Sequence, residues 1–396
     1  MTAAVPAGGS VAPAEGRMLP WGRARALANR LPAPLPPQEV PLAGAAGRAL
    51  AAPVLARAAV PGFDNSAMDG YAVRGGGPWR VTGRILAGCP DPGALRDRTA
   101  VEIATGAPVP AGADRVVPYE DADRAGNLVS APAVGREHIR RRGEDASPGD
   151  LLVSAGGPVT PAVMGLAASA GLDTLTVARP PRVRVLLTGD EIVRAGIPGP
   201  GQVRDALGPL LPPLLAGFGA EVTGLDLIDD TAGPLTAAMA GAAEEVVIVC
   251  GSSSVGPADH LHAALSRLAA TVHVDGVACR PGRPQLLAEL GGARWAVGLP
   301  GNPFAALVAA YTLPQPLIAG LTGRGLPELP SALVSGATRP LPGQTRLVPV
   351  RWGAGSAVVV AHDRSGYLGA AALADALAII EPGWTPTTPT GLIVLR

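Results

Sequence analysis

Residues 182–191 read RVRVLLTGDE and residues 246–256 read VVIVCGSSSVG. Each stretch is a short apolar run followed at once by small and polar residues, which is typical of a buried strand that ends in a loop. Apolar residues with helical spacing lie between the two stretches, at 210–218 and 235–243. A further strand pattern at 295–299 leads into PGNP, which opens a helix. Strands that alternate with helices predict a doubly wound, mainly parallel sheet.

The rest of the chain surrounds this predicted α/β domain, which we place at residues 180–325. Residues 51–146 contain short strand patterns separated by Gly and Pro, and they predict a small β-rich module. Strand patterns return at 326–396, where a barrel-like β domain is expected. Residues 1–50 and 147–179 remain for a linking helical domain with a mobile N-terminus. The helices expected in this linking domain are at 21–31, 42–50 and 161–170.

The overall composition restricts the class of protein. The chain has 396 residues, and 47% of them are hydrophobic, so it can build sizeable cores despite its 53 glycines and 43 prolines. Its 32 basic and 32 acidic residues leave no net charge, which argues against nucleic acid or an anionic membrane as a partner. All of the basic residues are arginine, so chemistry that needs a lysine amine is excluded.

Cysteine usage and hydropathy indicate where the protein works. Cys89, Cys250 and Cys279 lie far apart in the sequence, which argues against a disulfide framework and fits a reducing cytosol. Residues 1–16 lack the basic start and the continuous apolar core of a secretory signal. We find no run of about 18 apolar residues and therefore expect no membrane-spanning helix. The expectation is a soluble, cytoplasmic protein of several domains.

Four loops at one edge of the predicted sheet carry polar or anion-binding residues. The first ends at Glu191, directly after a strand, where active-site carboxylates tend to lie. The second begins at Gly251, and its small residues let backbone N–H groups approach a phosphate. The third places Arg280 and Arg283 on a Pro-Gly turn. Two guanidinium groups that converge on a cleft suit a tetrahedral oxyanion.

The fourth loop contains Pro300 and Asn302 and lies at the same edge, because the carboxyl ends of parallel strands meet there. The carboxylate of Asp259, beyond the second loop, is a suitable ligand for Mg²⁺. The neighbouring His260 and His262 are either ligands or, as is favoured, surface residues near the start of a helix. These loops together predict a site for a phosphorylated or oxyanionic small molecule with a divalent cation.

Three polar segments outside the predicted sheet have two interpretations each. In PGFDNSAMDGYAV (61–73), Asp64 either points at a metal or oxyanion or belongs to a turn, because Asp-Asn and Asp-Gly favour turns. Thr105 is either a donor to a ligand oxygen or, as is favoured, part of a structural turn. RRRGED (140–145) is interpreted as a solvated network of salt bridges, with anion binding as the alternative.

Seven motifs occur in the order found in the molybdopterin molybdenumtransferases, the MoeA family that includes the gephyrin E-domain, and resemble the motifs of that family. They are PGFDNSAMDGYAVR (61–74), ATGAPVPAGAD (104–114), RRRGEDASPGD (140–150), LLTGDEI (186–192), SVGPAD (254–259), CRPGRP (279–284) and GLPGNP (298–303). The resemblance implies that molybdenum from molybdate is inserted into adenylylated molybdopterin, with release of AMP and the help of a divalent metal such as Mg²⁺. It implies a molybdopterin-binding fold and a step of molybdenum cofactor biosynthesis.

The resemblance also implies an L-shaped homodimer of four domains, with an active site shared between subunits and contacts with other proteins of cofactor biosynthesis or with acceptor proteins. The implied catalytic residues are Asp64, Glu191 and Asp259, and the implied metal ligands are Glu191, Asp229 and Asp259. Asp64 and Thr105 would reach the site across the dimer. The implied substrate-binding residues are Thr105, Asp145, Asp229, Gly251, Ser254, Arg280, Arg283, Pro300 and Asn302.

The chain departs from the family pattern at several positions. Arg280 and Arg283 take the places of two lysines, which fits a chain that has no lysine. Ser252 and Ser253 stand where the family has Gly and Val. Other departures are Ala206 and Leu207 in place of Ser-Asn, and Gln344 and Pro349 near positions where arginine is frequent. These changes leave an alternative, a catalytically weakened paralogue that binds or carries the cofactor or acts as an interaction scaffold.

Overall fold

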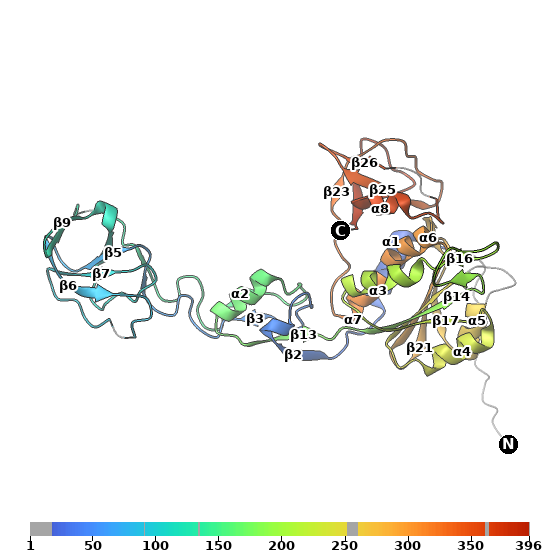
Figure 1. Cartoon of the computed structure of the whole chain (residues 1–396), viewed down its shortest axis with the longest axis horizontal. Coiled ribbons are helices and arrows are strands. Elements are labelled where there is room, and N and C mark those ends of the chain that lie inside the picture. The colour runs from blue at the N-terminus through green and yellow to red at the C-terminus, as the bar shows by residue number, and fades with distance from the viewer. Residues whose placement is uncertain (1–17, 91, 134, 252–259, 361–363, 396) are drawn as a thin grey trace, which may run out of the picture. The chain divides into compact units, whose positions relative to one another are not determined.

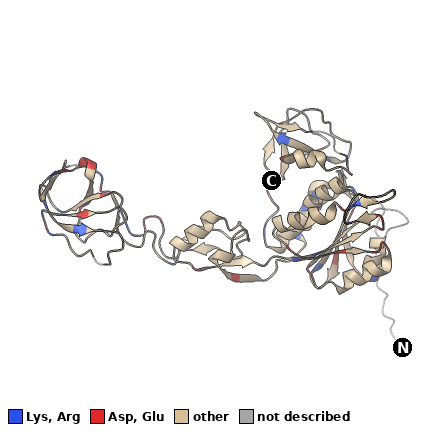
Figure 2. Ribbon diagram, in the orientation of Figure 1, with Lys and Arg blue, Asp and Glu red and all other residues tan. Residues whose placement is uncertain are grey.

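The computed structural model describes residues 18–90, 92–133, 135–251, 260–360 and 364–395 (Figure 1). The chain forms two compact units. The smaller unit is Pro37–Val177, and the larger unit combines Met1–Pro36 with Ala178–Arg396. Charged residues of both signs are scattered over the ribbons of both units (Figure 2). The four-domain division expected from the sequence stays a prediction.

The larger unit is built around a six-stranded sheet in the order β17-β14-β18-β22-β21-β19. The strands from β17 to β22 in this order are parallel, whereas β21 and β19 are attached in antiparallel fashion. This confirms the predicted mainly parallel sheet. The strands are β14 (Arg182–Thr188), β17 (Glu221–Ile228), β18 (Val246–Cys250), β19 (Thr271–Asp275), β21 (Leu286–Gly291) and β22 (Arg294–Leu299).

Helices cover both faces of this sheet (Figure 1). Alternate side chains of β18 enter different cores: Val246 and Ile248 join the core that contains α3 and α6, whereas Val247 and Val249 join the core that contains α4 and α5. A strand buried on both faces has to be apolar at every position, which explains the unbroken run VVIVC. The helices are α3 (Leu207–Gly217), α4 (Ala232–Gly241), α5 (His260–Arg267), α6 (Pro303–Thr312) and α7 (Pro314–Leu321).

The expectation that no segment could span a membrane overlooked one stretch. Residues Pro303–Leu321, which form α6 and α7, are long and apolar enough by length and composition. However, 89% of this stretch is buried inside the larger unit. We therefore interpret it as a helical segment of the protein core.

A second sheet of the larger unit joins the N-terminal and C-terminal segments in the order β1-β20-β25-β27-β28-β23. The predicted N-terminal helix is confirmed as α1 (Trp21–Arg30), and the indole Nε1 of Trp21 donates to Thr312 Oγ1 of α6 at 3.0 Å. The linking domain expected at 1–50 thus has its first helix in the larger unit. The further elements are β1 (Leu19–Pro20), β20 (Val277–Arg280), β23 (Ser331–Ala332), β24 (Val334–Ser335), β25 (Thr345–Trp352), β26 (Ala357–Val359), α8 (Gly369–Leu373), β27 (Ala376–Ile380) and β28 (Thr390–Val394).

The smaller unit contains a six-stranded sheet in the order β8-β5-β7-β6-β10-β9, as the predicted β-rich module requires. Its strands are β5 (Gly70–Val73), β6 (Trp79–Ile85), β7 (Thr99–Ile103), β8 (Arg115–Pro118), β9 (Asp123–Ala125) and β10 (Leu128–Ser130). The predicted helix near residue 161 is confirmed as α2 (Pro161–Ser169), whose first turn is capped by the Thr160 hydroxyl. The short strands are β2 (Pro37–Pro41), β3 (Val54–Leu55), β4 (Asn65–Ser66), β11 (Ile139–Arg140), β12 (Leu151–Val153) and β13 (Thr174–Ala178).

The helix expected at 42–50 is wrong. Only Leu42–Gly44 forms a short 3-10 turn, and the chain then turns at Gly47, whose φ is 73°. Backbone N–H groups beyond the turn bond to distant carbonyls, as Leu50 N does to Gly157 O at 2.9 Å. These long-range pairings within the unit replace the local hydrogen bonds that a helix would need.

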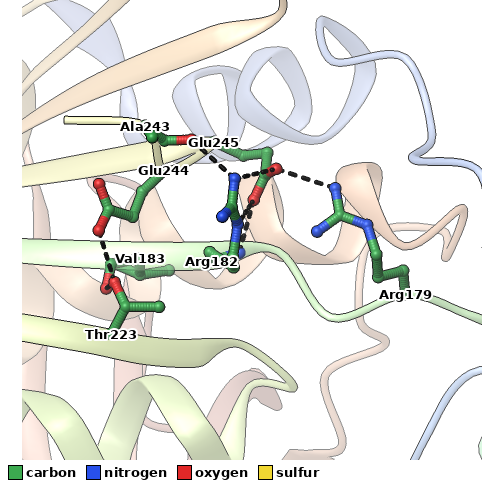
Figure 3. Close-up of polar contacts among 7 residues, drawn as sticks. All are labelled: Arg179, Arg182, Val183, Thr223, Ala243, Glu244 and Glu245. Atoms are coloured by element: carbon green, nitrogen blue, oxygen red, sulfur yellow. Dashed lines mark hydrogen bonds and ion pairs between the residues drawn. The ribbon is translucent and has the colours of Figure 1, made fainter.

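A partly buried carboxylate anchors the chain where the larger unit resumes after β13. Glu245 accepts hydrogen bonds from Arg179 Nη2 and from the backbone N–H of Arg182, both at 2.8 Å (Figure 3). Its side chain is 14% exposed. Burial opposes ionisation, but the two arginines outweigh this and lower the pKa of Glu245 to about 2.

We predict that Glu245→Gln removes stability that depends on pH. Because the pKa of Glu245 in the folded state lies below its ordinary value of 4.5, the carboxylate stabilises the fold above pH 4.5 and loses this effect as the pH falls towards 2. The variant should be less stable by about 2 kcal/mol at neutral pH, with a smaller difference at pH 3. Scanning calorimetry at both pH values measures this.

The matched control is Glu221→Gln, which removes an exposed carboxylate from the start of β17. This variant should follow the wild type at both pH values. A constant difference between Glu245→Gln and the wild type from pH 7 to pH 3 would contradict the assigned role of the charge.

Candidate functional site

A cleft of about 560 Å³ opens at the carboxyl ends of β14, β18 and β22. Its polar walls include Thr188 at the end of β14, Glu191 beyond it, Gly251 after β18 and Asn302 after β22. Three of the four loops predicted from the sequence thus meet in one cavity, because parallel strands end at the same edge. The short strands β15 (Ile192–Val193) and β16 (Val203–Arg204) form another wall.

Gly251 allows two strand ends to approach each other closely. Its φ is +110°, and a Cβ atom at this position would lie 2.4 Å from Thr188 O and 2.8 Å from Thr188 Oγ1. The Thr188 hydroxyl donates to Cys250 O at 3.1 Å and so ties β14 to β18 at the floor of the cleft. A side chain at residue 251 would therefore both strain the backbone and separate the two strands.

Carboxylates from three segments line the cleft: Glu191, Asp205 and Asp230. Asp205 Oδ1 accepts hydrogen bonds from Leu207 N at 3.0 Å and Gly208 N at 2.8 Å, so it caps the first turn of α3. Leu207 is only 6% exposed and belongs to the core of the sheet. The apolar residue at 207, a departure from the family pattern, thus contributes to packing.

The thiol of Cys250, which lines the cleft, is not a nucleophile. Cys250 lines the cleft, but burial, with a smaller effect from Asp205, raises the pKa of its thiol well above the ordinary value. Burial likewise raises the pKa of Cys279 to about 12. Both thiols are therefore protonated at neutral pH and inert.

A second hollow of about 480 Å³ adjoins the cleft and shares Asn302 and Gly366 with it. Arg280 and Pro300 line this groove, as the sequence predicted for the anion-binding edge, together with Arg364. None of the described residues that line it carries a carboxylate. An acidic cleft and a cationic groove are therefore neighbours. We call the 560 Å³ hollow the acidic cleft and the 480 Å³ hollow the cationic groove.

The structure does not bring the two predicted arginines together. Arg280 lines the cationic groove, whereas Arg283 lines neither hollow, although its side chain is exposed. The Arg283 carbonyl accepts a hydrogen bond from Val277 N at 3.0 Å, which fixes the turn between β20 and β21. Arg364 lines the groove instead, and no motif in the sequence marks it.

The three predicted site loops of the smaller unit are joined to one another. Asp64 Oδ2 pairs with Arg141 Nη1 at 3.0 Å, and Asp64 Oδ1 accepts from Arg142 N at 2.8 Å. This backbone hydrogen bond, opposed by desolvation and supported by Arg141, lowers the pKa of Asp64. The Thr105 N–H donates to Asp69 Oδ1 at 2.8 Å. Asp145 N donates to Val60 O at 3.0 Å, beside the Asp64 loop.

The arrangement supports the structural interpretation of RRRGED in part, because Arg141 also pairs with Glu137 at 2.6 Å. Asp64, Thr105 and Asp145 are each at least partly exposed, so these loops can still present them to a ligand.

Some predicted residues are placed differently or lie outside the described residues. Asp229 is exposed and is not among the residues that line the acidic cleft, whereas its neighbour Asp230 is. Ser254 and Asp259 lie outside the described residues, as do Ser252 and Ser253.

The acidic cleft offers ligands that suit Mg²⁺. Within the described segments, no three His, Cys, Asp or Glu side chains come together as a metal site. However, Mg²⁺ commonly takes one or two protein carboxylates and completes its coordination with water and substrate phosphates. Glu191 and Asp230 fit this pattern, because their two carboxylates line the same cleft.

The fold and the two hollows define a class of protein: a doubly wound α/β protein with a site for an anionic small molecule at the carboxyl ends of its strands. Residues 19–171 match the family model of the MoeA N-terminal region (domain I and II), and residues 184–320 match that of a probable molybdopterin binding domain. The chain belongs to the molybdopterin molybdenumtransferase family, which is a family of transferases.

Curated relatives and solved structures support this membership. The molybdopterin molybdenumtransferase of Haemophilus influenzae is 37% identical over 78% of this chain and 78% of its own length. Molybdopterin molybdenumtransferase 2 of Mycobacterium tuberculosis is 35% identical over 77% of this chain and 80% of its own. The crystal structure of a molybdopterin biosynthesis MoeA protein from Pyrococcus horikoshii has a TM-score of 0.77 at 25% identity and covers 96% of this chain and 100% of its own.

Proposed function

We propose that the protein inserts molybdenum from molybdate into adenylylated molybdopterin and releases AMP, as a step of molybdenum cofactor biosynthesis. Membership of the family supports this activity, and one structural observation carries it. The acidic cleft and the cationic groove share Asn302 and Gly366, so a single ligand can reach both. A phosphoanhydride with a bound cation needs both kinds of surroundings.

The residues of the two hollows have separate tasks in this proposal. Arg280 in the groove neutralises an anionic group, and Asn302 at the junction orients it. Glu191 and Asp230 would hold Mg²⁺, which when bound supplies charge neutralisation at phosphate oxygens. Because the buried thiols are protonated and the chain has no lysine, we assign no covalent nucleophile. Positioning and electrostatic stabilisation then supply the rate enhancement.

The non-catalytic alternative is not favoured. It relied partly on Ala206 and Leu207, and Leu207 has a role in the core behind the cap formed by Asp205. Glu191, Gly251, Arg280 and the further cleft carboxylates are all present at the strand ends.

One assay tests the proposed activity. Purified protein is incubated with adenylylated molybdopterin, molybdate and Mg²⁺, and AMP release is measured. We expect release that depends on molybdate and on Mg²⁺ and that stops when EDTA removes the metal. AMP at the level of a protein-free control, from protein that still binds the substrate, would refute the activity.

We further propose a cytoplasmic homodimer in which the smaller unit contributes Asp64, Thr105 and Asp145 to the partner's site. The exposure of all three on neighbouring loops supports this. Contacts with other proteins of cofactor biosynthesis or with acceptor proteins belong to the same proposal. Size-exclusion chromatography with light scattering should give twice the mass of 39.5 kDa.

We predict that Asp64→Asn lowers AMP release by about 100-fold, because a carboxylate presented to the reacting groups is lost. Asparagine can still accept the hydrogen bond from Arg142 N, so the loop should keep its structure. The measurement is AMP release alongside the circular dichroism melting curve. The control Glu120→Gln, an exposed carboxylate of the same unit, should keep full activity. Wild-type turnover by Asp64→Asn would exclude Asp64 from the site.

A further inference from the structure

The cationic groove takes its cations from two distant parts of the sequence. Arg280 ends β20, where it is paired with Arg346 of β25. Arg364 follows β26, more than 80 residues after Arg280 in the sequence. Both side chains line the groove, and both residues are exposed. Within the part of the chain that the structure describes, neither guanidinium has a hydrogen bond or ion pair.

The segment that carries Arg364 is fixed to the site by its backbone. The Ser365 carbonyl accepts hydrogen bonds from Phe304 N at 2.9 Å and Ala305 N at 3.2 Å. These are N–H groups of the first turn of α6, whose N-cap residue Asn302 makes no side-chain cap. Tyr367 N donates to Arg364 O at 3.1 Å and closes a turn. The backbone that presents Arg364 is thus held against the loop that contains Pro300 and Asn302.

Two positions on or near β25 lack the arginines that are frequent in the family. The family pattern leads one to expect arginines near Gln344 and Pro349, and neither residue can supply a cation. Pro349 is buried in β25, where it is paired with Leu377 of β27. Arg364, on the segment after β26, supplies the groove with a cation that neither of these positions carries.

Two cations in one groove repel each other, and no carboxylate among the described lining residues offsets them. A tetrahedral oxyanion removes this repulsion, because each guanidinium fork can donate two parallel hydrogen bonds to it. We propose that Arg364 is a binding residue of the site, and that with Arg280 it holds a tetrahedral oxyanion, either the phosphate of AMP or molybdate. This deepens the proposed function and rests on it for the choice of these anions.

Calorimetric titration of the full-length protein with AMP, inorganic phosphate and molybdate tests this proposal. Arg364→Ala should weaken the binding of at least one of the three anions about 10-fold, and Arg364→Lys less, because lysine keeps the charge but loses the fork. Weaker binding of AMP and phosphate would identify the phosphate, and weaker binding of molybdate alone would identify molybdate. Arg351→Ala, an exposed arginine of β25 away from both hollows, should bind as the wild type does.

Wild-type affinity of Arg364→Ala for all three anions would overturn the proposal, as would a wild type that binds none of them at millimolar concentration. A parallel measurement of AMP release shows whether the groove assignment or the proposed function has failed. If the wild type releases no AMP but Arg364→Ala still binds anions more weakly, the proposed function fails and the groove assignment stands. If AMP release by Arg364→Ala has the wild-type KM and kcat, the assignment fails and the function stands.

Discussion

Glu191→Gln is expected to lower AMP release by about 10³-fold, the loss of roughly 4 kcal/mol of transition-state stabilisation. Glu191 lines the acidic cleft directly after β14, and its carboxylate is one of the oxygen donors available to a divalent cation there. Glutamine has nearly the same shape and keeps a neutral oxygen, so the variant removes the charge and little else. AMP release at saturating substrate over a range of Mg²⁺ concentrations measures the effect.

A control variant and the Mg²⁺ dependence show whether Glu191 acts through the cation. Glu221→Gln removes a carboxylate from the start of β17, at the opposite end of the parallel strands, and should retain full activity. If Glu191 acts through the cation, the variant should also need more Mg²⁺ for half-maximal activity. Turnover of Glu191→Gln within about threefold of the wild type would show that the reacting groups lie elsewhere.

Gly251→Ala is expected to destabilise the larger unit by about 3 kcal/mol and to abolish binding in the acidic cleft. The left-handed backbone conformation costs about 1–2 kcal/mol for a residue with a Cβ. The remainder comes from the 2.4 Å approach of that Cβ to Thr188 O, a backbone atom that moves only if β14 and β18 separate. Scanning calorimetry measures the stability, and titration with adenylylated molybdopterin, the ligand proposed to reach both hollows, measures the binding.

The control separates the two causes. Gly291 has a φ of +81°, and a Cβ there would have no atom within 4 Å. Gly291→Ala should therefore lose about 1 kcal/mol from backbone strain alone and bind adenylylated molybdopterin as the wild type does. Equal destabilisation by both variants would mean that the contact with Thr188 has no cost and that the strands yield easily.

The sequence predicted the strands of the parallel sheet well, because burial on both faces leaves a distinct local pattern. The run VVIVC has no polar residue, and β18 occupies the predicted positions. The antiparallel strands β19 and β21 were not expected, since their sequences lack a continuous apolar run. The helix expected at 42–50 fails for a related reason, because helical spacing of small alanines is a weak signal beside long-range backbone pairing.

Some residues of the candidate site can likewise be predicted from the sequence, and others cannot. Glu191, Gly251 and Asn302 were predicted from loops that directly follow parallel strands, and the structure places all three in one cleft. Asp230 and Arg364 were not predicted. Neither lies in a recognisable motif, and their nearness to the site depends on how distant strands pair.

The family and the doubly wound sheet can be predicted from the sequence, because ordered motifs and the period of apolar residues are local properties of the chain. Which charges share a cavity depends instead on how distant segments pack together. The pairing of β20 with β25 and the capping of α6 by the Ser365 carbonyl bring Arg364 to the groove of Arg280 and leave Arg283 outside it. Such contacts join residues far apart in sequence, and their register follows from packing of the whole unit.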